Sequence, residues 1–217
     1  RGLSNTYLSF DYFRTQFVQQ MVVDYEHTAY AIDFYNLDGR RSFTDNYQLD
    51  FSIEPVDRFT VTATFRYTKA KIELEGKGLV EKPMTSRYKG VLNLQYATNL
   101  NKWIFDFTAS VNGPSRVYDF MAEMEDDNGN IIYKKGLTPV YPLLYLQVTK
   151  RFKGVDVYVG GENLTNFRQK DVILGSKRDA AGNVVPSYAS FDASAIWGPL
   201  MGIKVYAGVR FTLWKKA

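Results

Sequence analysis

Apolar and polar residues alternate over long stretches of this chain. Between Ser86 and Val111, Leu, Tyr, Trp and Phe recur at alternate positions, while Lys, Asp, Thr and Ser occupy most of the positions between them. A period of two residues over ten or so positions predicts strands that have one apolar and one polar face. The segment Asn99-Leu100-Asn101 separates two such runs, and so short a connection predicts an antiparallel hairpin.

Two further hairpins are predicted by choosing the register that matches both faces. One turns at Pro55-Val56-Asp57 and sets Ile53 opposite Phe59. The other turns at a Lys-Gly tip and sets Phe152 opposite Val155. Register is well specified where apolar residues meet on one side and polar or oppositely charged residues meet on the other.

The final alternating run, Ile203–Trp214, is expected to pair with the strand that follows the Lys-Gly tip. The matching register sets Asp156 opposite Arg210 and places Tyr158 over Gly208. An aromatic ring that covers a cross-strand glycine compensates for the missing side chain. We therefore expect this contact although a long segment separates the two strands.

With an opening strand within Leu3–Glu26 and a partner within Ala31–Glu54, the chain contains about eight strands, and the opening strand has room for more than twenty residues. Three short turns fall at one end of the sheet. The other end carries long polar loops, at residues 27–42, 73–85, 113–140 and 168–201. Outer-membrane barrels have short periplasmic turns and long outer loops. The sequence therefore predicts an all-β protein, an antiparallel transmembrane β-barrel.

Alternation alone does not say whether the apolar face points into a core or into lipid. Opposite charges pair across the predicted polar face, several strands exceed the usual five or six residues, and aromatic residues gather near the short turns as an interfacial girdle does. The girdle residues are Phe59, Trp103, Phe152, Phe211 and Trp214. These features favour apolar residues facing lipid. Two alternatives stay open: a small closed outer-membrane barrel with a structural or adhesion role, and a soluble β-barrel that binds a small hydrophobic ligand.

Composition narrows the function classes. The 217 residues carry 27 Lys plus Arg and 23 Asp plus Glu, a formal net charge of +4. These charges are scattered singly rather than clustered, which argues against a nucleic-acid partner. The chain has no Cys, so disulfides, thiolate metal sites and Cys nucleophiles are excluded. No apolar run reaches the roughly 18 residues that a spanning helix needs.

No arrangement of residues calls for catalysis, a cofactor or a metal. With one His, no Ser-His-Asp combination is available, and the cluster of Asp24, Glu26 and His27 is interpreted as loop residues rather than metal ligands. Residues 126–130 begin like a calcium loop but lack its turn Gly and closing Glu. We read 127–130 and 179–183 as tips of projecting hairpins. The sequence thus predicts that the protein is not an enzyme.

Basic and aromatic residues of the outer loops are the candidates for contact with an anionic or sugar-like ligand. They are Arg116, Tyr118, Tyr133, Arg168, Arg178 and Tyr188. An ordinary solvated loop surface has a similar composition, so both interpretations stay open for each residue.

Four segments in the carboxyl-terminal part of the chain form a recognisable series: Gly160-Gly161-Glu162-Asn163-Leu164-Thr165-Asn166-Phe167-Arg168-Gln169, Phe191-Asp192-Ala193-Ser194, Trp197-Gly198-Pro199 and Lys204-Val205-Tyr206-Ala207-Gly208-Val209-Arg210-Phe211. Together, in this order, they resemble the last strands of TonB-dependent outer-membrane receptors. Upstream, Tyr12-Phe13-Arg14-Thr15, Phe34-Tyr35-Asn36-Leu37-Asp38-Gly39 and Leu79-Val80-Glu81-Lys82-Pro83 are also similar to this family.

The resemblance implies that residues 1–217 are the carboxyl-terminal portion of a 22-stranded plugged barrel, its last eight strands, with the N-terminal plug and the earlier strands absent. The implied function is import of a scarce nutrient, such as a metal chelate, cobalamin or a glycan, across the outer membrane of a Gram-negative bacterium. The implied partners are outer-membrane lipid, the missing plug and strands, the imported solute, and the TonB complex acting through the absent N-terminal region. One departure from the family is Lys215-Lys216-Ala217 after the terminal aromatic Trp214.

Overall fold

A single antiparallel sheet organises the chain in the computed structural model, which describes residues 6–26, 32–125, 130–169, 174–178, 184–191 and 195–212, the backbone alone for 174–178 and 184–191. The strands are β1 (Tyr7–Phe17), β2 (Met21–Asp24), β3 (Asp33–Asn36), β4 (Ser42–Val56), β5 (Phe59–Leu74), β6 (Gly78–Glu81), β7 (Tyr88–Ala97), β8 (Trp103–Asn112), β9 (Tyr141–Phe152), β10 (Val155–Glu162), β11 (Leu174–Arg178), β12 (Val184–Phe191) and β13 (Lys204–Phe211). Short helices are η1 (Asn99–Asn101), α1 (Asp119–Ala122) and η2 (Lys134–Gly136).

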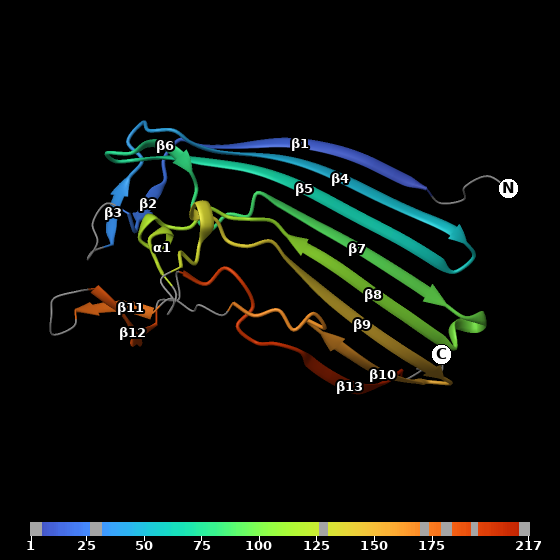
Figure 1. Ribbon diagram of the computed structural model, residues 1–217. Helices are drawn as coiled ribbons and strands as arrows, with labels where there is room; N and C mark the ends of the chain where they lie inside the picture. Colours follow the sequence, from blue (N-terminus) through green and yellow to red (C-terminus); the bar gives the residue numbers. More distant parts are fainter. Residues whose placement is uncertain are drawn as a thin grey trace.

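The main sheet has the strand order β1-β4-β5-β7-β8-β9-β10-β13, and the short strand β6 also pairs with β5. Eight long antiparallel strands in a row confirm the predicted all-β architecture. The sheet is open, with β1 and β13 as its two ends (Figure 1). The short turns lie at one end of the strands, and β2, β3, α1, β11 and β12 gather at the other, which we call the loop end (Figure 1).

Two of the predicted registers are confirmed. Strands β9 and β10 pair with Arg151 opposite Asp156, and the Arg151 guanidinium donates to the carboxylate at 3.1 Å. Strands β10 and β13 pair with Asp156 opposite Arg210 and Tyr158 opposite Gly208. A Cβ added to Gly208 would collide with the Tyr158 ring, so the glycine is needed where the aromatic side chain crosses it.

The predicted register of β4 and β5 is wrong by two residues. Ile53 lies opposite Val61 instead of Phe59, because the chain turns at Asp57-Arg58, where Arg58 adopts a φ of 68°, rather than at Pro55. Proline lacks a backbone N–H and interrupts the ladder, and the register is irregular there. A shift of two residues leaves every side chain on its predicted face.

The opening segment does not form one strand of more than twenty residues. Strand β1 ends at Phe17, and β2 pairs instead with β3, with Val22 opposite Tyr35, as a separate hairpin at the loop end. Val22 is buried together with Leu37, Ile72 and Leu74. The opening segment therefore leaves the sheet to cover the end of β5.

The fourth loop contains the projecting ribbon that the sequence predicts, formed by β11 and β12. Its predicted tip, residues 179–183, lies outside the described residues. In the third loop an isolated antiparallel bridge joins Glu125 and Ile131, on either side of a tip, 127–130, most of which is also outside the described residues. His27 and Trp214 lie outside them as well.

The two faces of the sheet differ as predicted. We call the side that bears Leu49, Ala63, Leu92, Phe107 and Val148 the apolar face, and the other side the polar face. On the apolar face the side chains are open to the surroundings: Val157, Val159, Val205 and Val209 are 41%, 51%, 75% and 52% exposed. The buried hydrophobic clusters lie at the loop end, around Val22 and around Val117. The alternation therefore does not pack this face into a dry core.

Candidate functional site

The polar face of the sheet carries side chains that bond to one another from strand to strand. On β4 the carboxylate of Asp50 accepts hydrogen bonds from Thr64 Oγ1 at 2.6 Å and from Gln48 Nε2 at 2.7 Å. Since Thr64 belongs to β5, these bonds cross the ladder. In the described part of the chain, every buried side-chain nitrogen and oxygen has a hydrogen-bond partner.

The same pattern continues across the later strands. Asn93 on β7 donates to Asp106 and Thr108 on β8 at 3.0 and 2.8 Å. Tyr206 on β13 donates to Gln147 on β9 at 3.0 Å, passing over the glycine of the strand between them. The polar face is thus a largely hydrophilic surface with cross-strand bonds at several places, suited to line a water-filled passage.

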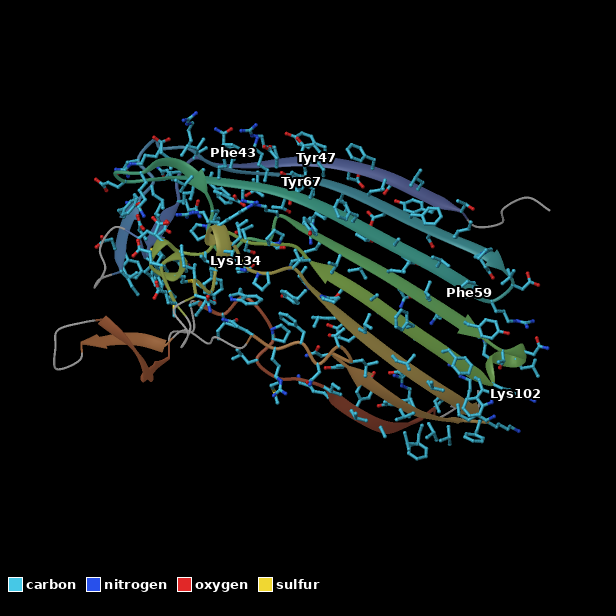
Figure 2. All side chains as sticks on the ribbon, in the orientation of Figure 1. Phe43, Tyr47, Phe59, Tyr67, Lys102 and Lys134 are labelled. Carbon is cyan, nitrogen blue, oxygen red and sulfur yellow. The ribbon has the colours of Figure 1, made fainter. Side chains whose placement is uncertain are left out.

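Two rows of aromatic side chains bound the apolar face. The inner belt, near the short turns, contains Phe59, Tyr96, Trp103, Phe105, Phe152 and Phe211. The outer belt crosses β1, β4, β5 and β7 as Tyr12, Tyr47, Tyr67 and Tyr88, each opposite the next. Ring centroids of Tyr12 and Tyr47 are 4.9 Å apart. Tyr47 and Tyr67 lie toward the loop end, and Phe59 lies at the short-turn end (Figure 2).

The separation of the belts matches a bilayer. At roughly 3.4 Å per residue, β5 runs roughly 27 Å from Phe59 to Tyr67. A strand tilt of about 40° projects this length to roughly 21 Å, close to the apolar band of about 25 Å in outer-membrane barrels. No helix in the described residues is long and apolar enough to cross a membrane.

A network of charged side chains joins three loops at the loop end. Arg116 Nη2 donates to Glu26 Oε1 at 2.8 Å and to Asp119 Oδ1 at 2.6 Å. The backbone N–H of Asp119 also donates to Glu26 Oε1, at 2.9 Å. Lys77 Nζ lies 2.5 Å from Asp119 and 3.8 Å from Glu26. We call these four residues, Glu26, Lys77, Arg116 and Asp119, the loop latch. Its central Glu26 side chain is 1% exposed, whereas the Asp119 side chain is 56% exposed, so the latch is an ion cluster built around one buried carboxylate.

The latch changes the acidity of one of its members. Burial acts to raise the pKa of Asp119, but the hydrogen bond from Lys77 and the charges of Arg116 and Lys77 outweigh it. The pKa of this carboxyl is therefore below its ordinary value, and Asp119 stays ionised at neutral pH.

A second contact group fastens the third and fourth loops to β9. Trp197 Nε1 donates to Tyr133 Oη at 3.0 Å, and Tyr141 Oη donates to the Trp197 carbonyl at 3.1 Å. Tyr141 and Phe167 stack with centroids 4.6 Å apart. These contacts hold the third and fourth loops against β9 at the loop end.

Four of the six predicted ligand-binding residues have described side chains. Arg116 belongs to the latch, and Tyr133 is 1% exposed within the aromatic group. Tyr118 packs against Tyr25 at 5.0 Å and Phe120 at 5.6 Å. These residues hold loops together, and contact with a ligand stays a prediction for them.

Arg168 is exposed and lies beside Gly202, and it takes no part in the ion pairs of the latch. The side chains of Arg178 and Tyr188 lie outside the described residues, although their strands β11 and β12 pair at the loop end. A ligand-binding role for these three residues also stays a prediction.

Sequence reasoning missed the roles of Glu26 and Asp24, which were interpreted as loop residues. Asp24 is buried and accepts hydrogen bonds from Tyr35 Oη and the Glu26 N–H, each at 2.8 Å. Glu26 meets Arg116 across 90 positions of sequence, and no periodicity links the two. Among the described residues, no three His, Asp or Glu side chains gather into a possible metal site.

No protein-family model matches the chain, and no curated protein sequence matches it. Its fold is similar to that of solved TonB-dependent receptors. The copper transporter OprC has a TM-score of 0.60 at 14% identity, over 95% of this chain and 28% of OprC. The receptor FpvA of P. aeruginosa, bound to a heterologous pyoverdine with iron, has a TM-score of 0.51 at 13% identity, over 95% of this chain and 24% of FpvA.

The ferric-catecholate import receptor Fiu of E. coli K12, in its closed form, has a TM-score of 0.50 at 16% identity, over 75% of this chain and 21% of Fiu. This chain therefore spans only about a quarter of the solved structures that it matches. The predicted architecture is confirmed, since the chain has the fold of a portion of the barrel of TonB-dependent receptors.

Proposed function

We propose that this chain forms part of the lumen wall and four outer loops of a TonB-dependent receptor in the outer membrane of a Gram-negative bacterium. The receptor imports a scarce solute, such as a metal chelate, cobalamin or a glycan, and performs no catalysis. The observation that carries the proposal is an open sheet whose exposed apolar face is bounded by two aromatic belts, with a hydrogen-bonded polar wall on its other face.

The two faces of the sheet contact different surroundings in the proposed barrel. In the barrel, the apolar face contacts hydrocarbon, where Leu, Val and Phe gain free energy by leaving water. The polar face meets a watery lumen, where the carboxylates of Asp50 and Asp106 accept hydrogen bonds from hydroxyl and amide groups. Within the described residues, β1 and β13 each pair on one side only, and further barrel strands of the same receptor cover their other edges.

The loop end receives the solute. The loop latch and the aromatic group fix the loops, and the exposed Arg168, together with Arg178 and Tyr188, offers positive charge and aromatic surface to an anionic or sugar-like solute. Energy for import comes from the TonB complex, acting through an N-terminal region and a plug that lie outside this sequence.

The two rival functions account for less of the structure. A soluble barrel that binds a hydrophobic ligand needs its apolar side chains inside, whereas Val205 is 75% exposed on the apolar face. A small closed barrel needs β1 to pair with β13, whereas these strands end an open sheet. An exposed apolar surface of this extent in water would aggregate.

The topology is testable by labelling, because this chain has no Cys. In the receptor as the cell produces it, Lys135→Cys lies at the loop end and Asp57→Cys at a short turn. A membrane-impermeant maleimide should label Lys135→Cys in intact cells and Asp57→Cys only after the outer membrane is opened. The parent protein serves as the control. Equal labelling of both variants in intact cells contradicts the proposal.

Transport is tested with named probes. Uptake of an iron-55 ferric catecholate, copper-64, labelled cobalamin and a labelled maltooligosaccharide is compared in cells with and without the gene. Uptake of one probe should require both the gene and the TonB system. If every probe enters equally without the gene, import of these solutes is contradicted.

A further inference from the structure

The hydrophobic pattern changes sides along β5. From Phe59 to Tyr67 the odd-numbered, outward-facing side chains are apolar. Beyond Tyr67 the buried apolar side chains are Ala70, Ile72 and Leu74, on the opposite side, where Ile72 and Leu74 pack beneath the β2–β3 hairpin. The outward positions now hold Lys69, Lys71 and Glu73. The outward surface of β5 therefore turns from apolar to charged above the outer belt, and the first two charged residues are lysines.

Strands β1 and β4 contribute to the same surface. Arg14 lies opposite Asp45, which lies opposite Lys69, and Phe43 lies opposite Lys71. The Arg14 guanidinium sits 4.3 Å above the Phe43 ring and 3.6 Å from Asp45. Figure 2 places Phe43 beyond Tyr47 toward the loop end. Arg14, Phe43, Asp45, Lys69 and Lys71 make up what we call the basic rim.

Tyr12 of the outer belt is tied to the basic rim, because its hydroxyl donates to the Asp45 carboxylate at 3.1 Å. The Asp45 side chain is 9% exposed, and the Arg14 side chain is 47% exposed. The carboxylate and the Phe43 ring thus hold the Arg14 head group in place while one side of it stays open to a ligand.

The rim retains uncompensated positive charge. Glu81 lies opposite Lys71 on β6, but it forms a bidentate pair with Arg87 at 2.8 and 2.7 Å. Glu73, the next outward residue of β5, pairs with Arg41 at 3.3 Å. Asp45 is engaged with Arg14 and Tyr12. In the described part of the chain, no salt bridge reaches Lys69 or Lys71.

We infer that the basic rim binds the phosphate groups of a phosphorylated lipid in the outer leaflet, an inference that rests on the proposed membrane location. Lys69, Lys71 and Arg14 present cationic donors at the height of the outer tyrosine belt, which is where lipid head groups meet the acyl region. The acyl chains of the same lipid lie on the apolar face below, along Leu49 and Phe65, which are exposed there.

The chemistry suits a lipid phosphate better than a free one. The guanidinium binds phosphate oxygens bidentately, and the two lysines add point charges. Their methylene stems cover apolar surface while the ammonium groups reach the head-group layer. A free phosphate ion gains only the charge contacts, whereas a lipid adds burial of its chains.

The experiment uses the receptor as the cell produces it, purified in detergent and placed in phosphatidylcholine nanodiscs. Diphosphorylated lipid A is titrated in, and bound lipid is counted by native mass spectrometry. Lys69→Gln/Lys71→Gln is compared with Lys134→Gln/Lys135→Gln, which removes equal charge from the loops. We expect retention of lipid A to fall about tenfold in the rim variant and to stay unchanged in the loop variant. Lys69→Arg/Lys71→Arg should bind as well as the parent.

The remaining outcomes decide against the inference. Equal binding by the parent and the rim variant overturns it, as does equal loss in the loop variant. If dephosphorylated lipid A binds as well as the phosphorylated form, the surface recognises acyl chains only. If 10 mM inorganic phosphate displaces the lipid, the rim is a free-anion site. Outer-membrane fractionation and maleimide labelling of the same variants show separately whether the proposed membrane location itself has failed.

Discussion

Apolar residues alternate with polar residues in both halves of β5, but they lie on opposite sides of the strand in the two halves. Between Phe59 and Tyr67 the apolar side chains lie on the outward face, where Phe65 and Tyr67 are 47% and 43% exposed. Between Ala70 and Leu74 the apolar side chains face inward and are buried beneath the β2–β3 hairpin. What covers a face, rather than the alternation itself, decides whether its apolar residues belong to a core or to a lipid contact.

The spanning sheet and the loop end are held together by different kinds of contact. Backbone ladders and lateral polar bonds hold the sheet together, and its register follows from matching both faces of the paired strands. Contacts between residues far apart in the sequence hold the loops, above all the latch of Glu26, Arg116, Asp119 and Lys77. Substitutions at the loop end should therefore open the loops, whereas substitutions in the sheet should destabilise the barrel.

The largest effect is expected from breaking the latch. Arg116→Met removes the bidentate partner of a carboxylate whose side chain is 1% exposed. Of its described partners, the carboxylate keeps only the Asp119 N–H and Lys77 at 3.8 Å, so the cost should approach, without exceeding, about 3–5 kcal/mol, the cost of breaking a buried pair. The loop end should open while the barrel stays folded, so outer loops become sensitive to protease on intact cells while the heat-modified gel shift of the barrel is retained. Lys134→Met is the matched control, and loss of the gel shift in Arg116→Met alone would contradict the separation of the two regions.

The next effect tests which face meets lipid. Leu92→Arg places a charge on the apolar face between Ala63 and Ala109, which costs about 2–4 kcal/mol near the bilayer midplane. Gln95→Arg, on the polar face opposite Asp106, should be tolerated. Urea titrations of the receptor folded into lipid vesicles measure both free energies of unfolding. An equal cost for the two substitutions would show that both faces meet the same medium.

A smaller effect is expected within the ladder of β10 and β13. Gly208→Ala introduces a methyl group into the Tyr158 ring, and overpacking of this kind costs about 1–3 kcal/mol. The double variant Gly208→Ala/Tyr158→Ala should recover part of that loss, since it removes the clash. The same urea titration measures both. No recovery in the double variant would mean that the ring is not what excludes the methyl group.

The sequence predicts the sheet better than the loop end, for a physical reason. Pairings such as Asp156 with Arg210 follow from a fixed period of two residues, and even the wrong register around Pro55 kept each side chain on its face. The partnership of Glu26 with Arg116 has no period and spans 90 positions. Lys69 and Lys71 continue the alternation, but their role depends on the hairpin that folds over Ile72, which the pattern of β5 does not contain.

The smallest expected effect is a difference in pH dependence between the loop end and the spanning sheet. The pKa of Asp119 is lowered in the folded loop end, so its contribution to stability is complete above the ordinary carboxyl pKa and is lost as pH falls through the lowered folded value. Hydrogen exchange of the third loop should therefore accelerate more between pH 7 and pH 3 than that of the spanning strands, after correction for intrinsic rates. Asp119→Asn should reduce this difference, because the amide does not titrate. An undiminished difference in that variant would show that the Asp119 carboxyl is not the group responsible for the pH dependence of the loop end.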